Sequence, residues 1–234
     1  MTKRTLFPAR LYIRKFLNTF FPRILFRLSP NRFWARHHWS SQNKGDQHGF
    51  DNYCMDRPAV GILLREMEQL VPKDTAVLDL GCNCGYYLSR LKGEGYTRLT
   101  GVDICENAIV YGREHLDLAG VETIPGSFED ILPQLLAGNR KFGLVYTVGA
   151  TIELVHPSFD VIGNICALSE DYIVIFIGQW GHDYPRFWDY EFNRNGFLLV
   201  KNITPYDGKT DPAADPTQIS SLLIYKRWTP RETR

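Results

Sequence analysis

The sequence predicts an α/β protein with a doubly wound, mostly parallel sheet of seven strands, whose last strand is antiparallel, and with a basic amphipathic helical arm at the amino end. Short apolar runs alternate with helical stretches from residue 75 onward, which is typical of a parallel sheet covered on both faces. Two further apolar runs near the carboxyl end are joined by a loop alone. With 234 residues, 44% of them hydrophobic, the chain can bury one sizeable core but not two ordinary ones.

The arm is predicted over residues 1–39, before a single domain at 40–234. Nine of the 27 Lys and Arg residues lie in the arm and the first acid of the chain is Asp46, whereas the rest of the chain is acidic. Apolar residues recur at helical spacing from Ile13, and Pro22 should kink or divide the helix. Three roles stay open: binding to an anionic membrane surface, packing on the protein's own body as a lid, and mitochondrial targeting.

The elements of the body follow in chain order. A helix is predicted after residues 37–55, which read as a connecting loop, with Asp56 as its cap and Pro58 in its first turn. Strands are predicted at 75–80, 97–102, 121–124, 142–147, 171–177, 197–203 and 220–227. Helices are predicted near 84–93, 105–118, 129–137, 157–168 and 184–195. The last two strands are expected to be antiparallel neighbours, because no helix separates them.

Five cysteines are an odd number, and no secretory signal precedes them. A reducing compartment and a cytoplasmic location are therefore expected. No apolar stretch approaches the roughly 20 residues of a membrane-spanning helix. Any association with a membrane is accordingly expected to be peripheral and to use the arm.

The turn after the first strand, residues 81–85 (GCNCG), is the strongest candidate site. It is not a zinc site, because zinc needs four ligands and no second Cys pair or His pair follows. Its Cys-x-Cys spacing also differs from the Cys-x-x-Cys of redox motifs. In an open parallel sheet, ligands bind beyond the carboxyl ends of the strands, where glycine lets the backbone approach them closely. The turn is therefore predicted to cradle a small ligand, without a metal, and its cysteines are interpreted as packing residues.

Two carboxylates end neighbouring strands of the predicted sheet. Asp79 ends the first strand and suits a cationic amino group, whereas Asp103 ends the second strand and can accept both hydroxyl groups of a ribose. Together they indicate a nucleoside ligand that carries an amino group.

The motifs at 79–85 (DLGCNCG), 101–103 (GVD) and 126–130 (GSFED) together resemble those of the class I, Rossmann-like S-adenosylmethionine-dependent methyltransferases. The resemblance covers about residues 56 to 228. It implies S-adenosylmethionine as the cofactor, with the ribose held by Asp103 and the adenine bordered by Ser127 and Phe128. The cofactor-binding residues that it implies are Asp79, Gly81, Cys82, Asn83, Gly85, Asp103, Ile104, Ser127 and Phe128.

Three positions depart from the family pattern. Asn83 replaces the middle glycine of D-x-G-x-G-x-G, Ser127 stands where an Asp often contacts the adenine, and Gly143 replaces a frequent Asp. These departures leave open a non-catalytic binding module with the same fold. A nicotinamide-dependent oxidoreductase is less favoured, because its G-x-G-x-x-G motif requires glycine at Asn83 and Tyr86.

The candidate catalytic residues lie in loops after the fourth and fifth strands. Glu153 and His156 follow the fourth strand and could reach a substrate; His182, Asp183 and Arg186 follow the fifth. A His-Asp-x-x-Arg run can supply a base, a carboxylate that orients it and a contact for an anion.

The predicted acceptor is a small molecule or glycan-like compound, methylated on oxygen, because similar-looking family members include enzymes of sugar and surface-glycan biosynthesis. Nucleic acid is not expected as a substrate. The Asn/Asp-Pro-Pro-Tyr/Phe motif and the Pro-Cys pair of nucleic-acid methyltransferases are absent, and the body of the chain is acidic.

Overall fold

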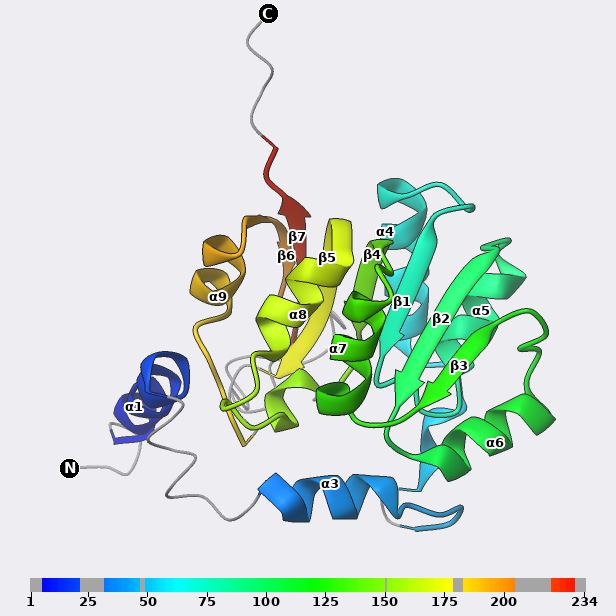
Figure 1. The fold of residues 1–234 in the computed structure, drawn as a ribbon, viewed down its shortest axis with the longest axis horizontal. Coiled ribbons are helices and arrows are strands. Elements are labelled where there is room, and N and C mark those ends of the chain that lie inside the picture. Colours follow the sequence, from blue (N-terminus) through cyan, green and yellow to red (C-terminus); the bar gives the residue numbers. More distant parts are fainter. Residues whose placement is uncertain are drawn as a thin grey trace, which may run out of the picture.

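The computed structural model describes residues 6–21, 32–46, 49–149, 151–178, 183–204 and 220–229. These residues form one seven-stranded sheet with the order β3-β2-β1-β4-β5-β7-β6 (Figure 1). The strands are β1 (Ala76–Leu80), β2 (Arg98–Asp103), β3 (Glu122–Pro125), β4 (Phe142–Thr147), β5 (Ser169–Gly178), β6 (Phe197–Ile203) and β7 (Ser220–Arg227). Strand β7 is antiparallel to β5 and β6, and the other neighbouring pairs are parallel. The predicted fold class is confirmed.

Helices cover both faces of this sheet. The described helices are α1 (Leu6–Phe20), α3 (Arg32–Ser40), α4 (Pro58–Leu70), α5 (Tyr86–Gly93), α6 (Glu106–His115), α7 (Phe128–Ala137), α8 (Val161–Leu168) and α9 (Trp188–Arg194), with short 3-10 turns η1 (Phe50–Tyr53) and η2 (Ile152–Leu154). Apolar side chains of α7, α8 and α9 pack on one face, and those of α4 and α5 pack on the other. Because helices cover both faces of the sheet, a ligand-binding site is expected at the ends of the strands.

The two helices of the arm lie in different places. In Figure 1, α3 lies below the carboxyl ends of the parallel strands, whereas α1 stands at the side of the molecule next to α9. Helix α1 ends at Phe20, two residues before Pro22, and residues 22–31 lie outside the described residues. None of the described helices combines the length and apolar character needed to span a membrane.

The segment before β1 differs from the prediction in two respects. Helix α3 continues through Ser40, across the predicted end of the arm, and η1 interrupts the predicted loop. Asp56 is not the cap of α4: Arg57 holds that position, with Pro58 at the start of the helix. The Asp56 carboxylate instead accepts a charge-assisted hydrogen bond from Arg90 of α5.

Cys54 and Cys84 form a disulfide that joins the segment after η1 to the turn before α5. The interpretation of Cys84 as a packing residue is therefore wrong. The buried cysteines Cys82, Cys105 and Cys166 are free thiols. Because 30 residues separate Cys54 from Cys84, only the three-dimensional fold pairs them.

Candidate active site

The turn between β1 and α5 presents its backbone because its surroundings exclude side chains. Gly81 has a φ of +78°, and a Cβ atom there would lie 2.2 Å from Cγ2 of Thr151. On the other side of the turn, a Cβ atom on Gly112 of α6 would lie 1.8 Å from the carbonyl oxygen of Cys84. Gly85 also has a positive φ, +79°, and begins α5. Glycine at these positions lets the backbone approach closely.

Asn83 adopts the backbone conformation that a glycine would otherwise supply. Its φ is +51°, in the left-handed region, which Asn tolerates better than most residues. Its Oδ1 accepts a hydrogen bond from the backbone N–H of Cys84 at 2.7 Å, and its own N–H donates to Oδ2 of Asp103 at 2.8 Å. The departure from the glycine pattern therefore preserves the turn and ties it to β2.

Asp103 is buried at the end of β2 with both oxygens facing backbone donors. Its Oδ1 accepts the N–H of Cys105 at 2.8 Å, and its Oδ2 accepts that of Asn83. A carboxylate oxygen has two lone pairs, so each oxygen can accept one further hydrogen bond. Burial raises the pKa of Asp103, while these backbone bonds lower it.

Asp79 is 2% exposed at the end of β1, where Tyr146 of β4 donates a hydrogen bond of 2.8 Å to its Oδ2. Burial raises the pKa of Asp79 to about 8; the bond from Tyr146 lowers it, and the nearby Asp103 raises it. Without a cation beside it, this carboxyl group is protonated at neutral pH. A ligand that brings a positive charge would favour the ionised form.

Two cavities meet at the turn. They share five lining residues: Tyr53, Gly81, Asn83, Val148 and Gly149. The larger cavity has a volume of about 520 Å³. It is lined by the turn together with Asp103, Ile104, Ser127 and Phe128. The smaller cavity, of about 200 Å³, contains Asp79 and Cys82. Of the predicted cofactor-binding residues, eight line one cavity or both; Gly85 lines neither and shapes the start of α5.

Helix α3 covers the larger cavity. Arg36, Trp39 and Gln42 line it. Arg36 donates to Oγ of Ser127 at 2.9 Å and forms an ion pair of 2.7 Å with Asp130. The Ser127 hydroxyl donates to Asp130 and also accepts the N–H of Asp130 as the cap of α7. This hydroxyl, which the family resemblance predicts beside an adenine, is thus bound to the arm.

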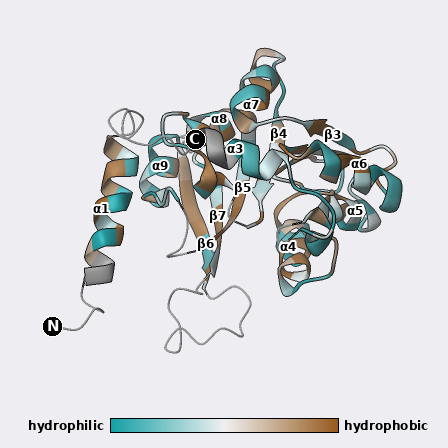
Figure 2. Cartoon of the chain, turned by 90° about the horizontal axis from the view of Figure 1, so that it is seen from below, coloured by the Kyte–Doolittle hydropathy of each residue, from teal (hydrophilic) through white to brown (hydrophobic). Residues whose placement is uncertain are grey.

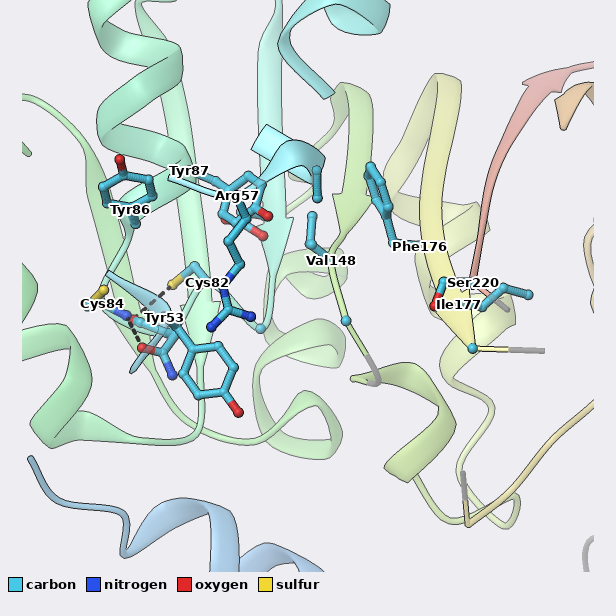
Figure 3. Close-up of a pocket in the computed structure, with 16 residues that line it drawn as sticks. Tyr53, Arg57, Cys82, Cys84, Tyr86, Tyr87, Val148, Phe176, Ile177 and Ser220 are labelled. Carbon is cyan, nitrogen blue, oxygen red and sulfur yellow. Dashed lines mark hydrogen bonds between the residues drawn. The ribbon is translucent and has the colours of Figure 1, made fainter. Parts of the chain in front are cut away.

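The smaller cavity is lined by one cationic side chain and several aromatic ones. Tyr53, Arg57, Tyr87 and Phe176 line it together with Ser220 (Figure 3). The Arg57 guanidinium lies 5.3 Å from the centre of the Tyr53 ring and donates to the carbonyl oxygen of Asn52. Among the described residues, no carboxylate forms an ion pair with Arg57. Sequence patterns did not single out Arg57 or Tyr53, because only the fold brings the segment before α4 to the turn.

Among the described candidate catalytic residues, His156 lines a cavity at the turn. It is 3% exposed and lines the larger cavity. Its Nδ1 lies 2.9 Å from Oγ of Ser158, and its ring packs edge-on against Tyr184 with 5.1 Å between ring centres.

The described residues of the His-Asp-x-x-Arg run do not line the two cavities at the turn. His182 lies outside the described residues. Asp183 is exposed, and its carbonyl oxygen accepts a hydrogen bond from Arg14 of α1. Arg186 is buried, donates to the carbonyl oxygen of Val155 and lines a third cavity beside α1. In the described part of the run, Asp183 and Arg186 therefore border the arm instead of the turn.

Glu153 of η2 is buried and precedes Leu154, which lines the larger cavity. It is 1% exposed, burial raises its pKa to about 8, and its Oε2 has no hydrogen-bond partner. Glu153 lines neither cavity at the turn, but its carbonyl oxygen accepts the N–H of Tyr184 at 2.9 Å. Within the described ranges, no three His, Cys, Asp or Glu side chains are grouped so that they could hold a metal ion.

This donor set fits S-adenosylmethionine. The larger cavity has room for an adenosyl group, and the buried Asp103 retains lone pairs for ribose hydroxyls. On the other side of the turn, the protonated Asp79 would become a carboxylate next to the amino group of the methionine part.

Comparisons with known proteins agree with this fit. A family described as "Methyltransferase domain" matches residues 77–168. The chain is 27% identical over 110 residues to EEF1A lysine methyltransferase 2 of Mus musculus and 26% identical to that of Homo sapiens. These matches cover 44% of this chain and 45% and 47% of the relatives, so the chain spans less than half of their length.

Solved structures share the fold at low identity. Magnesium protoporphyrin IX methyltransferase from Synechocystis PCC 6803, with bound SAM, has a TM-score of 0.56 and 12% identity over 93% of this chain and 96% of its own. A TehB-like SAM-dependent methyltransferase from Corynebacterium glutamicum has a TM-score of 0.57 and 16% identity over 76% and 98%. The domain match falls on the strands and helices that build the turn: residues 77–168 form a methyltransferase domain, and the sheet has the strand order of class I S-adenosylmethionine-dependent methyltransferases.

Proposed function

We propose that the chain methylates an oxygen atom of a small-molecule or glycan-like acceptor that carries an anionic group. The observation that supports this acceptor is Arg57, a cation without a carboxylate partner among the described residues, in the small cavity that opens onto the turn. A carboxylate or phosphate on the acceptor would bind its guanidinium in a charge-assisted hydrogen bond.

The cofactor would lie along both cavities. Asp103 would bind the ribose hydroxyls, Ile104 and Phe128 would border the adenine, and Asp79 would bind the amino group. Bound S-adenosylmethionine supplies an activated methyl group on a sulfonium. The apolar and aromatic walls of the small cavity would exclude water from the reacting atoms, and Arg57 would orient the acceptor.

An alcohol acceptor starts protonated, so this reaction needs a base. His156 lines the larger cavity, and His182 follows β5; we propose both as candidates for this role. Asp183 and Arg186 border the arm. They would then help to position the loop between β5 and α9 and would not contact the acceptor.

Lysine methylation is the alternative that the relatives raise. Tyrosine rings such as that of Tyr53 can hold an ammonium group. In this chain, however, the Arg57 guanidinium already lies over the Tyr53 ring, and its positive charge would repel a lysine side chain. The small cavity therefore favours an anionic acceptor. A non-catalytic binding module is less favoured, because Asn83 retains the backbone conformation of the glycine that it replaces.

The acceptor can be found by incubating the protein with methyl-tritiated cofactor and a fractionated cell extract. We expect the label in a small anionic compound, identified by mass spectrometry, and we expect Arg57→Gln to raise the KM for this compound at least tenfold with little change in cofactor affinity. Label confined to lysine side chains of proteins would refute the proposed acceptor class.

A further inference from the structure

Helix α1 is attached to the body by one face. Leu11, Asn18 and Thr19 are buried there. The side-chain amide of Asn18 donates to the carbonyl oxygen of Pro185 at 2.8 Å, and the N–H of Phe187 donates to Oγ1 of Thr19 at 3.2 Å. This face is partly polar, and its contacts fix the rotation of the helix about its own axis.

The opposite face of α1 is apolar and exposed. Ile13, Phe16 and Phe20 recur at helical spacing on it. The apolar face, as we call it, consists of Tyr12 (64% exposed), Ile13 (59%), Phe16 (49%), Phe20 (42%) and Phe21 (41%), together with Tyr190 of α9 (45%). An amphipathic helix that packed only on its own protein would turn this face inward, so the exposed rings call for another partner.

The exposed rings form one continuous surface. The ring centre of Phe16 lies 5.2 Å from that of Phe20 and 5.6 Å from that of Phe21, and Phe20 lies 5.0 Å from Tyr190. Figure 2 shows α1 at the edge of the molecule beside α9, with hydrophobic and hydrophilic residues alternating along it. A flat surface could therefore contact the helix without obstruction from the sheet.

The described helices of the arm carry positive charge. Arg10 is exposed and lies one turn before Arg14 on the same side of the helix. Neither α1 nor α3 contains an acidic residue. Aromatic rings flanked by arginines are typical of helices that lie in the headgroup region of an anionic bilayer. Two copies of the chain joined through this face would instead bring their positive charges together.

We propose that the apolar face of α1 binds an anionic membrane surface and holds the protein there as a peripheral protein. The rings would enter the boundary between headgroups and acyl chains, while the exposed Arg10 would contact lipid phosphates and carboxylates. Because α1 is bonded to residues 183–187, the membrane would lie next to the loop between β5 and α9. This inference does not depend on the identity of the acceptor.

The test is co-sedimentation of the full chain with phosphatidylcholine vesicles that contain or lack phosphatidylserine. We expect binding only with phosphatidylserine, weakened by salt. The variant Phe16→Ser/Phe20→Ser should bind about tenfold or more weakly, because two apolar anchors are lost. Val200→Ser, which removes an exposed apolar side chain of β6 (54% exposed), is the matched control and should bind like the wild type.

The folding of each variant is checked by thermal melting and by affinity for S-adenosylhomocysteine, which neither substitution should change. Equal sedimentation of the double variant and the wild type would overturn the proposal, as would equal binding to vesicles without phosphatidylserine. A wild-type dimer in light scattering that the double variant abolishes would also overturn it, since a second copy would then cover the apolar face.

Discussion

At the scale of single residues, the turn after β1 depends on an asparagine in a left-handed conformation. Asn83→Ala should cost about 1 kcal/mol in backbone strain and also removes the bond from Oδ1 to the N–H of Cys84. We expect S-adenosylhomocysteine to bind about fivefold or more weakly to Asn83→Ala in isothermal titration. Asn83→Gly, which adopts the same φ freely, is the control and should stay within about twofold of the wild type. Equal affinities for the Ala and Gly variants would contradict this role of the φ angle.

The carboxyl group of Asp79 predicts a pH dependence of cofactor binding. In the unliganded protein its pKa is about 8, so below that pH the group must release a proton before it can bind an ammonium as a carboxylate. Affinity for S-adenosylhomocysteine should therefore rise from pH 6 to pH 8, by up to about tenfold per unit. At a more alkaline pH the ligand's own amino group loses its proton, and the affinity should fall again.

Titrations at neutral pH in two buffers with different ionisation enthalpies measure the proton release directly. Asp79→Asn should bind more weakly and release no proton at this site. A wild-type affinity that is constant from pH 6 to pH 8 would show that Asp79 is not the partner of the amino group.

The two histidines are predicted to act on the reaction and not on cofactor binding. His182→Ala or His156→Ala should lower kcat by about a hundredfold or more for whichever residue is the base, with cofactor affinity within about twofold. Kinetics with the acceptor identified by tritium transfer separate the two effects. Unchanged kcat in both variants would remove both histidines from this role.

At the scale of elements, α3 is the least expected part of the site. The strands were predictable to within a few residues, because each is a local run of buried apolar side chains, as in β4. The position of α3 was not predictable, because it depends on a hydrogen bond from Arg36 to Asp130, which lies 94 residues further along the chain. The same holds for the disulfide at Cys84 and for Arg57 in the small cavity. Local sequence patterns thus predicted the sheet and its turn. They did not predict which segments cover the cavities, because that depends on contacts between residues far apart in the chain.

The ion pair between Arg36 and Asp130 leads us to expect that α3 acts as a lid over the larger cavity. Arg36→Ala should speed the dissociation of S-adenosylhomocysteine several-fold in stopped-flow measurements, with a modest effect because both side chains are partly exposed and such pairs contribute at most about 1 kcal/mol. Arg140→Ala breaks a similarly exposed pair with Glu122, away from the cavities, and serves as the control. If both variants release the ligand at the same rate, α3 does not close the site.

At the scale of the whole molecule, the seven-stranded sheet gathers the ends of β1, β2 and β4 around one turn, and the arm adds a cover over the larger cavity and an apolar face at the side. In our proposal the sheet supplies the cofactor site. What distinguishes this chain lies outside the sheet, in α1, in α3 and in the segment that carries Tyr53 and Arg57.

The central claim is that the turn after β1 holds the adenosyl cofactor. Isothermal titration of S-adenosylhomocysteine into the wild type and into Gly81→Arg tests it most directly, with circular dichroism to establish that both are folded. The side chain of Arg cannot fit where even a Cβ atom would lie 2.2 Å from Thr151, so we expect saturable binding by the wild type and none by the variant. Equal binding by the two proteins would contradict the account.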